Sequence, residues 1–241
     1  MTSSLVRDKQ FAGEVEEPSR WERLAIACGI GYGAIFFAGL AFLTFFVVPK
    51  FAPIDAPPEQ HAAAWAEMGN LSAVASYLLT LQIPFLLLFL GGLYAVLRRA
   101  EGGSGALAVS AFGAGVAMAM IWPMGLLVAE IGTGVAVAGG DVVTAVEFDA
   151  MAPFSLALSA FPRAVLLFAT SLVLLGSGLV GRWVCWLGFA LALVSLLGTG
   201  MLVDGLVPFP ISLLGTMLFV VWVLALSISL FRSAPKAESA R

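Results

Sequence analysis

The sequence predicts an all-α membrane protein: a bundle of six transmembrane helices with both termini in the cytoplasm. Of its 241 residues, 61% are hydrophobic and 11% are charged, whereas about 25% of the residues of an ordinary soluble domain are charged. So few charges cannot cover the surface of a soluble globule, but a surface that faces the lipid bilayer is apolar. The net charge of −3 provides no basic footprint for nucleic acid, so we expect no nucleic-acid partner.

Six stretches are apolar over the roughly 20 residues that a membrane-crossing helix needs. The first exceeds the roughly 7–15 apolar residues of a signal peptide, so we interpret it as an uncleaved span. A short glycine-rich turn separates the fourth stretch from the fifth, which makes these two antiparallel neighbours. In order, the predicted spans are Leu24–Val48, Leu71–Leu97, Ala106–Val135, Pro153–Leu175, Trp183–Asp204 and Pro208–Phe231.

Basic residues predict the orientation, because Lys and Arg concentrate in cytoplasmic loops. With the N-terminus inside, the outer loops contain only Lys50 and are otherwise acidic. Each of these loops predicts a short helix, over residues 59–68 and 141–151. The chain then divides into a polar cytoplasmic segment (1–20), a transmembrane domain (21–232) and a cytoplasmic tail (233–241). The ten basic residues assigned to the cytoplasmic side are Arg7, Lys9, Arg20, Arg23, Arg98, Arg99, Arg182, Arg232, Lys236 and Arg241.

The residue types that the spans lack exclude several kinds of site. The single histidine, His61, falls in the first outer loop, which excludes haem bound by histidines within the spans. Cys28 and Cys185 fall near the cytoplasmic ends of their spans, so a zinc site built from His and Cys is excluded as well. No predicted span contains a lysine that could form a retinal Schiff base. We therefore expect no metal and no cofactor, and we assign no catalytic residue.

Polar residues inside the apolar spans form the candidate site. A charge near the bilayer centre costs about 2.5 kcal/mol or more, so it is retained where it is paired or faces a cavity. Arg163 lies about 15 Å into the fourth span, directly after Pro162, and Glu130 lies in the outer part of the third span, within reach of the arginine. Gln82 lies near the middle of the second span, and Asp204, at the outer end of the fifth, is a second candidate partner.

Two interpretations of Glu130 and Arg163 stay open: a structural salt bridge between the third and fourth spans, or a polar cavity open to the outer face. The cavity suggests binding or transport of a small or amphiphilic ligand, with Arg163 neutralising an anionic group. One alternative is a membrane-embedded enzyme that acts on a lipid or isoprenoid, with Glu130 as general acid; another is a non-catalytic partner subunit. Gly29 and Gly33 form a GxxxG motif, which predicts close packing within the monomer or a homodimer surface.

Six short motifs follow one another along the chain: IDAPPE (54–59), ASYLL (75–79), FLGGL (89–93), LRRAEG (97–102), FPRAV (161–165) and GRWVCWLG (181–188). In that order they resemble a large group of uncharacterised six-span integral membrane proteins common in actinobacteria. The resemblance covers about residues 20–232. It implies six spans and a bacterial plasma membrane, and the group has no assigned activity. Pro-Arg-Trp commonly opens the fifth span in that group, whereas Gly181 replaces the proline here and loosens the turn.

Overall fold

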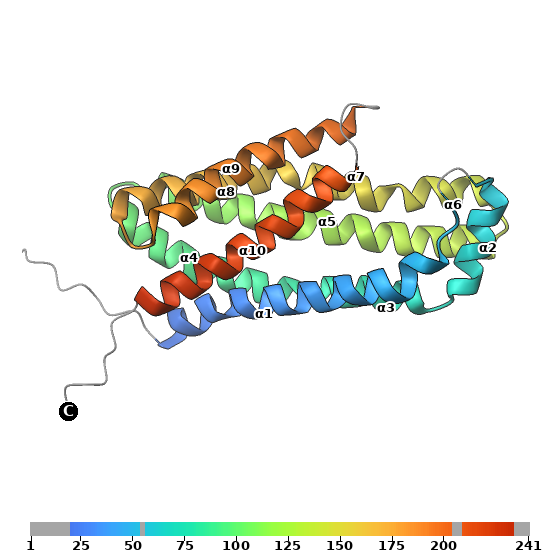
Figure 1. Ribbon diagram of the computed structural model, residues 1–241, viewed down its shortest axis with the longest axis horizontal. Coiled ribbons are helices and arrows are strands. Elements are labelled where there is room, and N and C mark those ends of the chain that lie inside the picture. Colours follow the sequence, from blue (N-terminus) through green and yellow to red (C-terminus); the bar gives the residue numbers. More distant parts are fainter. Residues whose placement is uncertain (1–19, 54–55, 204–208, 234–241) are drawn as a thin grey trace, which may run out of the picture.

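The computed structural model describes residues 20–53, 56–203 and 209–233, and this part of the chain contains helices and no strand. Six helical segments are long and apolar enough to cross a membrane, which confirms the predicted all-α, multi-pass membrane class. The long helices run along the long axis of the molecule, and α2 lies across one end (Figure 1). The helices are α1 (Arg20–Phe42), η1 (Leu43–Val47), η2 (Val48–Lys50), α2 (Pro58–Met68), α3 (Leu71–Thr80), α4 (Ile83–Glu101), α5 (Ala106–Ala138), α6 (Val142–Asp149), α7 (Met151–Leu158), α8 (Ala160–Ser177), α9 (Arg182–Gly198), η3 (Thr199–Leu202) and α10 (Phe209–Ser233).

The short helices predicted over 59–68 and 141–151 are both present, as α2 and α6. The predicted start of the fourth span at Pro153 is wrong, because α6, α7 and α8 form one apolar segment over Val142–Ser177. Pro153 lies in the first turn of α7, where proline is tolerated because no earlier helical carbonyl needs its missing N–H. Proline therefore does not mark the start of this span.

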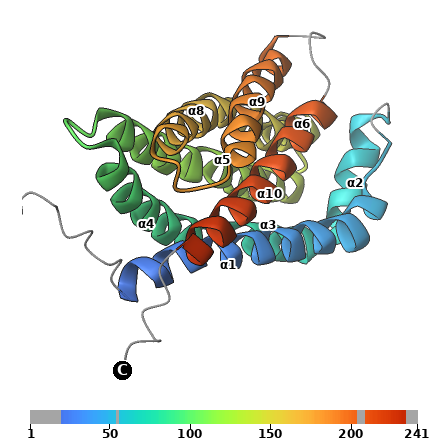
Figure 2. The ribbon, with the colours of Figure 1, turned by 60° about the vertical axis from the view of Figure 1, so that its left-hand side comes forward.

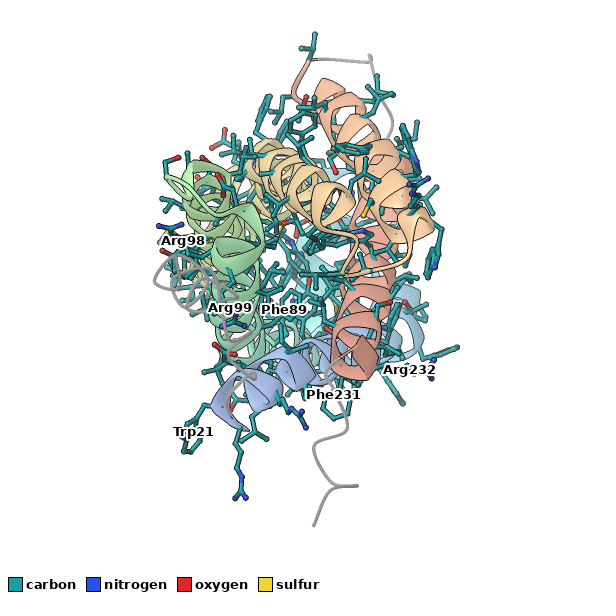
Figure 3. All side chains as sticks on the ribbon, turned by 90° about the vertical axis from the view of Figure 1, so that its left-hand side faces the viewer. Trp21, Phe89, Arg98, Arg99, Phe231 and Arg232 are labelled. Carbon is teal, nitrogen blue, oxygen red and sulfur yellow. The ribbon has the colours of Figure 1, made fainter. Side chains whose placement is uncertain are left out.

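The two ends of the bundle differ in charge. At the end where α1 begins and α10 ends, which we call the termini end, Arg98, Arg99 and Arg232 lie around the rim (Figure 3). Arg99 forms an ion pair with Glu22 at 2.6 Å there. The opposite end, which we call the α2 end, carries Lys50 as its basic residue within the described ranges. The basic residues thus gather at the end that the sequence predicts to be cytoplasmic. The orientation itself stays a prediction.

The spans are of two lengths. Four of them contain 31 to 36 residues, whereas Arg182–Leu202 and Pro210–Arg232 contain 21 and 23. The shortest of the four long spans has 31 residues, and the longer of the two short spans has 23. At 1.5 Å per residue, these two lengths differ by about 12 Å. In Figure 1, the end of α9 and the start of α10 lie near α7, well short of α2. The long spans therefore project beyond the short ones at the α2 end.

The glycine motif of the first span packs within the chain. A Cβ atom at Gly29 would lie within 3 Å of atoms of Ser227 and Phe89, and one at Gly33 within 3 Å of Leu224. The small residues therefore let α1 approach both α10 and α4, and α1 and α10 lie side by side in Figures 1 and 2. Because this surface is already covered, we do not propose a homodimer through Gly29 and Gly33.

Candidate functional site

Arg163 lies in the interior of the bundle, near the middle of the longest span. It is 14 residues from the end of α8 at Ser177, which is about 21 Å along the helix from the termini end. A hydrocarbon core is about 30 Å thick, which matches the two short spans, α9 with η3 and α10. A membrane that fits these spans therefore places Arg163 inside the hydrocarbon region. Its side chain is 1% exposed, so the charge is shielded from lipid.

Two neutral hydroxyl groups hold the guanidinium of Arg163. Its Nε donates to Ser195 Oγ of α9 at 3.0 Å, and its Nη1 donates to Thr216 Oγ1 of α10 at 2.5 Å. Thr216 in turn donates to the Ser212 carbonyl at 3.0 Å, which leaves its oxygen oriented to accept from Arg163. Nη2 has no hydrogen-bond partner among the described residues. The two hydrogen bonds thus fix the orientation of the guanidinium, and they leave Nη2 available for a further acceptor.

No ion pair between described residues involves Arg163. A buried cation without a carboxylate partner is unfavourable, because hydroxyl oxygens supply dipoles but no negative charge. Arginine does not relieve this by losing its proton, because a guanidinium stays protonated in proteins. The geometry therefore presents a permanent positive charge that lacks a counter-ion within the described part of the chain.

Gln82 lies in the break between α3 and α4, where the second span is interrupted at Leu81 and Gln82. Its side chain is 2% exposed, and its Nε2 donates to the Leu79 carbonyl at 2.6 Å. The amide thereby satisfies a carbonyl at the end of α3, which lacks a helical N–H partner. Its Oε1 has no partner among the residues described.

Arg163 and Gln82 line one small pocket of about 30 Å³, together with Tyr32, Ser159 and Thr216. This volume exceeds the roughly 10–15 Å³ that a cavity needs to hold one water molecule, so the pocket has room for at least one oxygen-sized group in this conformation. The polar lining thus combines an unpartnered cationic donor with an unpartnered neutral acceptor. The apolar part of the wall comes mainly from Ile83, Leu86, Met118, Trp122, Leu156 and Phe219.

Each of the three spans that contribute most of this lining contains a proline that lines the pocket or lies next to a lining residue. Pro84 lies at the start of α4, Pro123 lies inside α5 and itself lines the pocket, and Pro162 lies between Ser159 and Arg163 in α8. Each proline removes one backbone N–H and so weakens the hydrogen bonding of its helix locally. In membranes such interruptions occur where the backbone lines a cavity or is buried in protein. Their convergence supports a site at this level.

Glu130 does not contact Arg163. Its carboxylate accepts hydrogen bonds from Ser72 at 2.8 Å and Ser76 at 3.2 Å, both on α3. The predicted pairing of Glu130 with Arg163 is therefore wrong. Glu130 is 24 residues from the start of α5 at Ala106, or about 36 Å from the termini end. It lies in the projecting part of the long spans, beyond the depth of Arg163 by about 15 Å, or about three helical turns.

The surroundings of Glu130 are polar and half-buried. Asp149 of α6 interacts electrostatically with both Glu130 and His61 of α2, and Thr133 donates to the Ala145 carbonyl at 3.3 Å nearby on α5. Within the ranges described, no group of three or more His, Cys, Asp or Glu residues is placed to hold a metal ion. Asp204, the other predicted partner, lies outside the described residues.

A wider groove of about 580 Å³ lies at the α2 end between α5 and α6. Its wall is mainly apolar and includes Val135 and Phe148, and its one ionisable lining residue, Asp141, is exposed. This groove presents no buried polar group to a ligand. The pocket at Arg163 is therefore the candidate functional site.

Sequence reasoning identified Arg163 and Gln82 but missed Ser195, Thr216 and Tyr32. Hydroxyl residues in membrane helices often form hydrogen bonds between helices, and this was the one signal that pointed to Ser195 and Thr216. Comparison with known proteins does not extend the assignment: no family model matches the chain, and neither a curated protein nor a solved structure matches it.

Proposed function

We propose that this multi-pass membrane protein binds a small or amphiphilic ligand by placing an anionic group of that ligand against Arg163, as a step in ligand binding or transport. One observation carries the proposal. Arg163, a cation that is 1% exposed at mid-span, lines an internal pocket and donates hydrogen bonds only to neutral hydroxyl groups, and its Nη2 has no partner among the described residues.

The energetics favour a ligand over a structural role. A structural arginine in a membrane helix is stabilised by a carboxylate or by enough acceptors for its donors. Arg163 has two acceptors for three nitrogens, and both acceptors are neutral hydroxyl groups. An anionic oxygen at Nη2 would complete the hydrogen bonding and neutralise the charge, and charge-assisted hydrogen bonds of this kind are the strongest that proteins form.

The position of the pocket supports an amphiphile. Arg163 lies within the hydrocarbon depth, and most of the residues around the pocket are apolar. An alkyl chain attached to the anionic group would therefore stay in apolar surroundings. The clustering of Arg98, Arg99 and Arg232 at the termini end is typical of a cytoplasmic face, and we propose the bacterial plasma membrane as the location.

No observation favours the alternatives. An enzyme that uses Glu130 as general acid would draw on a second carboxylate at Asp204, which lies outside the described residues. A partner subunit recognised through the first span would have to replace contacts that Gly29 and Gly33 already make with α10 and α4.

Calorimetric titration of octyl sulfate tests the proposal, with the protein held in phosphatidylcholine nanodiscs so that no anionic lipid competes. The wild type is expected to show a saturable component above the linear partitioning of the probe into lipid. In Arg163→Gln this component should disappear, and in Arg163→Lys it should weaken, because lysine keeps the charge but loses the planar fork of donors.

Glu130→Gln is the matched control, since it also removes one charged side chain from a long span of the same bundle. It should bind octyl sulfate as the wild type does. Indistinguishable isotherms for the wild type and Arg163→Gln would reject the proposal, and so would an equal loss in Glu130→Gln.

A further inference from the structure

Two residues that line the pocket each have one unpartnered polar atom, and the two atoms have opposite hydrogen-bonding character. Arg163 Nη2 is a donor that carries positive charge, and Gln82 Oε1 is a neutral acceptor; neither has a partner among the described residues. Their side chains are 1% and 2% exposed. A buried polar atom without a partner costs about 1–3 kcal/mol, so a ligand that satisfies both atoms is favoured over one that satisfies a single atom.

The amide orientation of Gln82 follows from its place in the fold. Nε2 is committed to the Leu79 carbonyl at 2.6 Å, because α3 ends there and its last carbonyls lack helical donors. The oxygen is therefore the atom left over. A bare anion next to it would meet a second negative dipole, whereas a group that carries a proton would donate to it.

We propose that the ligand group bound in this pocket is a protonated oxyacid, such as the monoanion of an alkyl phosphate monoester. Its charged oxygen would accept from Arg163 Nη2, and its P–OH group would donate to Gln82 Oε1. This inference rests on the proposed function and adds the chemical class of the ligand.

The pocket itself does not change charge in the relevant pH range. Its titratable lining residues are Tyr32 and Arg163. The ordinary pKa of tyrosine, about 10, lies well above neutrality, and arginine keeps its proton in proteins. A phosphate monoester, in contrast, loses its second proton with a pKa of about 6. The pH dependence of binding therefore reports on the ligand proton.

Octyl phosphate and octyl sulfate form a matched pair of probes, because they share the alkyl chain and the tetrahedral oxyanion. Below the phosphate pKa of about 6 both are monoanions, but only the phosphate carries an O–H donor. Each ester is titrated by calorimetry into the full-length protein in phosphatidylcholine nanodiscs, at about pH 5 and about pH 7.5, which lie on either side of that value.

At the lower pH, the wild type is expected to bind octyl phosphate at least about fivefold more tightly than octyl sulfate, as one additional buried hydrogen bond would produce. Affinity for the phosphate should fall at the higher pH, while affinity for the sulfate stays constant. In Gln82→Leu the preference for the phosphate should disappear, and retained binding of octyl sulfate shows that the pocket of this variant is still formed.

Equal affinity for the two esters at both pH values would overturn the inference and leave the proposed function standing. A preference that survives in Gln82→Leu would overturn it as well. Absence of saturable binding for both esters would instead overturn the proposed function, and this inference with it. If Gln82→Leu fails to fold, the pH dependence of the wild type alone decides between these outcomes.

Discussion

Arg163 and Glu130 are charged side chains in the same helical bundle, and their surroundings differ in depth and in chemistry. Arg163 lies within the hydrocarbon depth, is 1% exposed and contacts two neutral hydroxyl groups. Glu130 lies in the projecting end, is half-buried, and accepts from two serines of α3. The glutamate has the donors that a carboxylate needs, whereas the arginine keeps one nitrogen without a partner among the described residues. A charged residue in an apolar span thus indicates a ligand site only when its own hydrogen bonding is incomplete.

The largest effect is expected from Arg163→Met, which replaces the cation by an apolar side chain of similar length. Octyl sulfate binding should weaken by at least about tenfold, since a charge-assisted contact is lost. The free energy of unfolding in detergent should stay within about 1 kcal/mol of the wild type, because removing a buried charge without a counter-ion relieves a desolvation cost. A loss of several kcal/mol would show that Arg163 is a structural element instead.

Thr216→Val should have the next largest effect, which is a loss of stability. Valine keeps the shape of threonine but leaves Arg163 Nη1 without its acceptor, at a cost of about 1–3 kcal/mol. Chemical denaturation in micelles measures the difference, and Thr199→Val, an exposed hydroxyl that bonds only within its own turn, is the matched control. Equal stability of the two variants would mean that the bond between Arg163 and Thr216 contributes nothing.

Smaller effects are expected at the Glu130 site. Ser72→Ala should cost about 0.5–1.5 kcal/mol, the usual net value of one hydrogen bond, and Ser76→Ala should cost less because its bond is longer, 3.2 Å against 2.8 Å. Neither variant should change octyl sulfate binding, which titration calorimetry checks. A change in octyl sulfate binding would show that the Glu130 site and the Arg163 site are coupled, which would contradict their separation in the structure.

The smallest effect is expected at Asp141, which caps α6 at the projecting end. Hydrogen bonds from the side chain and then the backbone N–H of Thr144 hold the pKa of Asp141 below its ordinary value. The folded state therefore favours the ionised carboxylate, so this stabilisation is present above the ordinary aspartate pKa of about 3.9 and is lost as the pH falls through the lower folded-state value. Thermal unfolding should show a slightly lower melting temperature for Asp141→Asn near neutral pH. The two melting temperatures should converge in acid; a constant difference at every pH would contradict the assignment.

The number of spans and the presence of a charge deep in the fourth span could both be predicted from the sequence, because they follow from hydropathy and the cost of a buried charge. The depth of Glu130 could not be predicted. The residues after Glu130 in α5 are as apolar as those before it, so the pattern does not show that the helix continues past the thickness of a bilayer. That length becomes visible only beside α9 and α10, which are shorter.

The partners of Arg163 were also beyond prediction, for a different reason. Every span contains serine or threonine, so nothing in their pattern singles out Ser195 and Thr216. Helix packing decides which hydroxyl groups face the guanidinium. Gln82, which lines the same pocket as Arg163, could be included in the candidate site because an amide next to Pro84 in an apolar span is rare enough to stand out.

A double-mutant cycle between Arg163→Met and Glu130→Gln tests most directly whether the two charges belong to separate sites. The free energies of unfolding of the wild type, the two single variants and the double variant are measured under one set of detergent conditions. Residues without a shared partner should give additive effects, within about 0.5 kcal/mol. A coupling energy above about 1 kcal/mol would mean that Glu130 balances the charge of Arg163 after all, and would contradict the assignment of the arginine to a ligand.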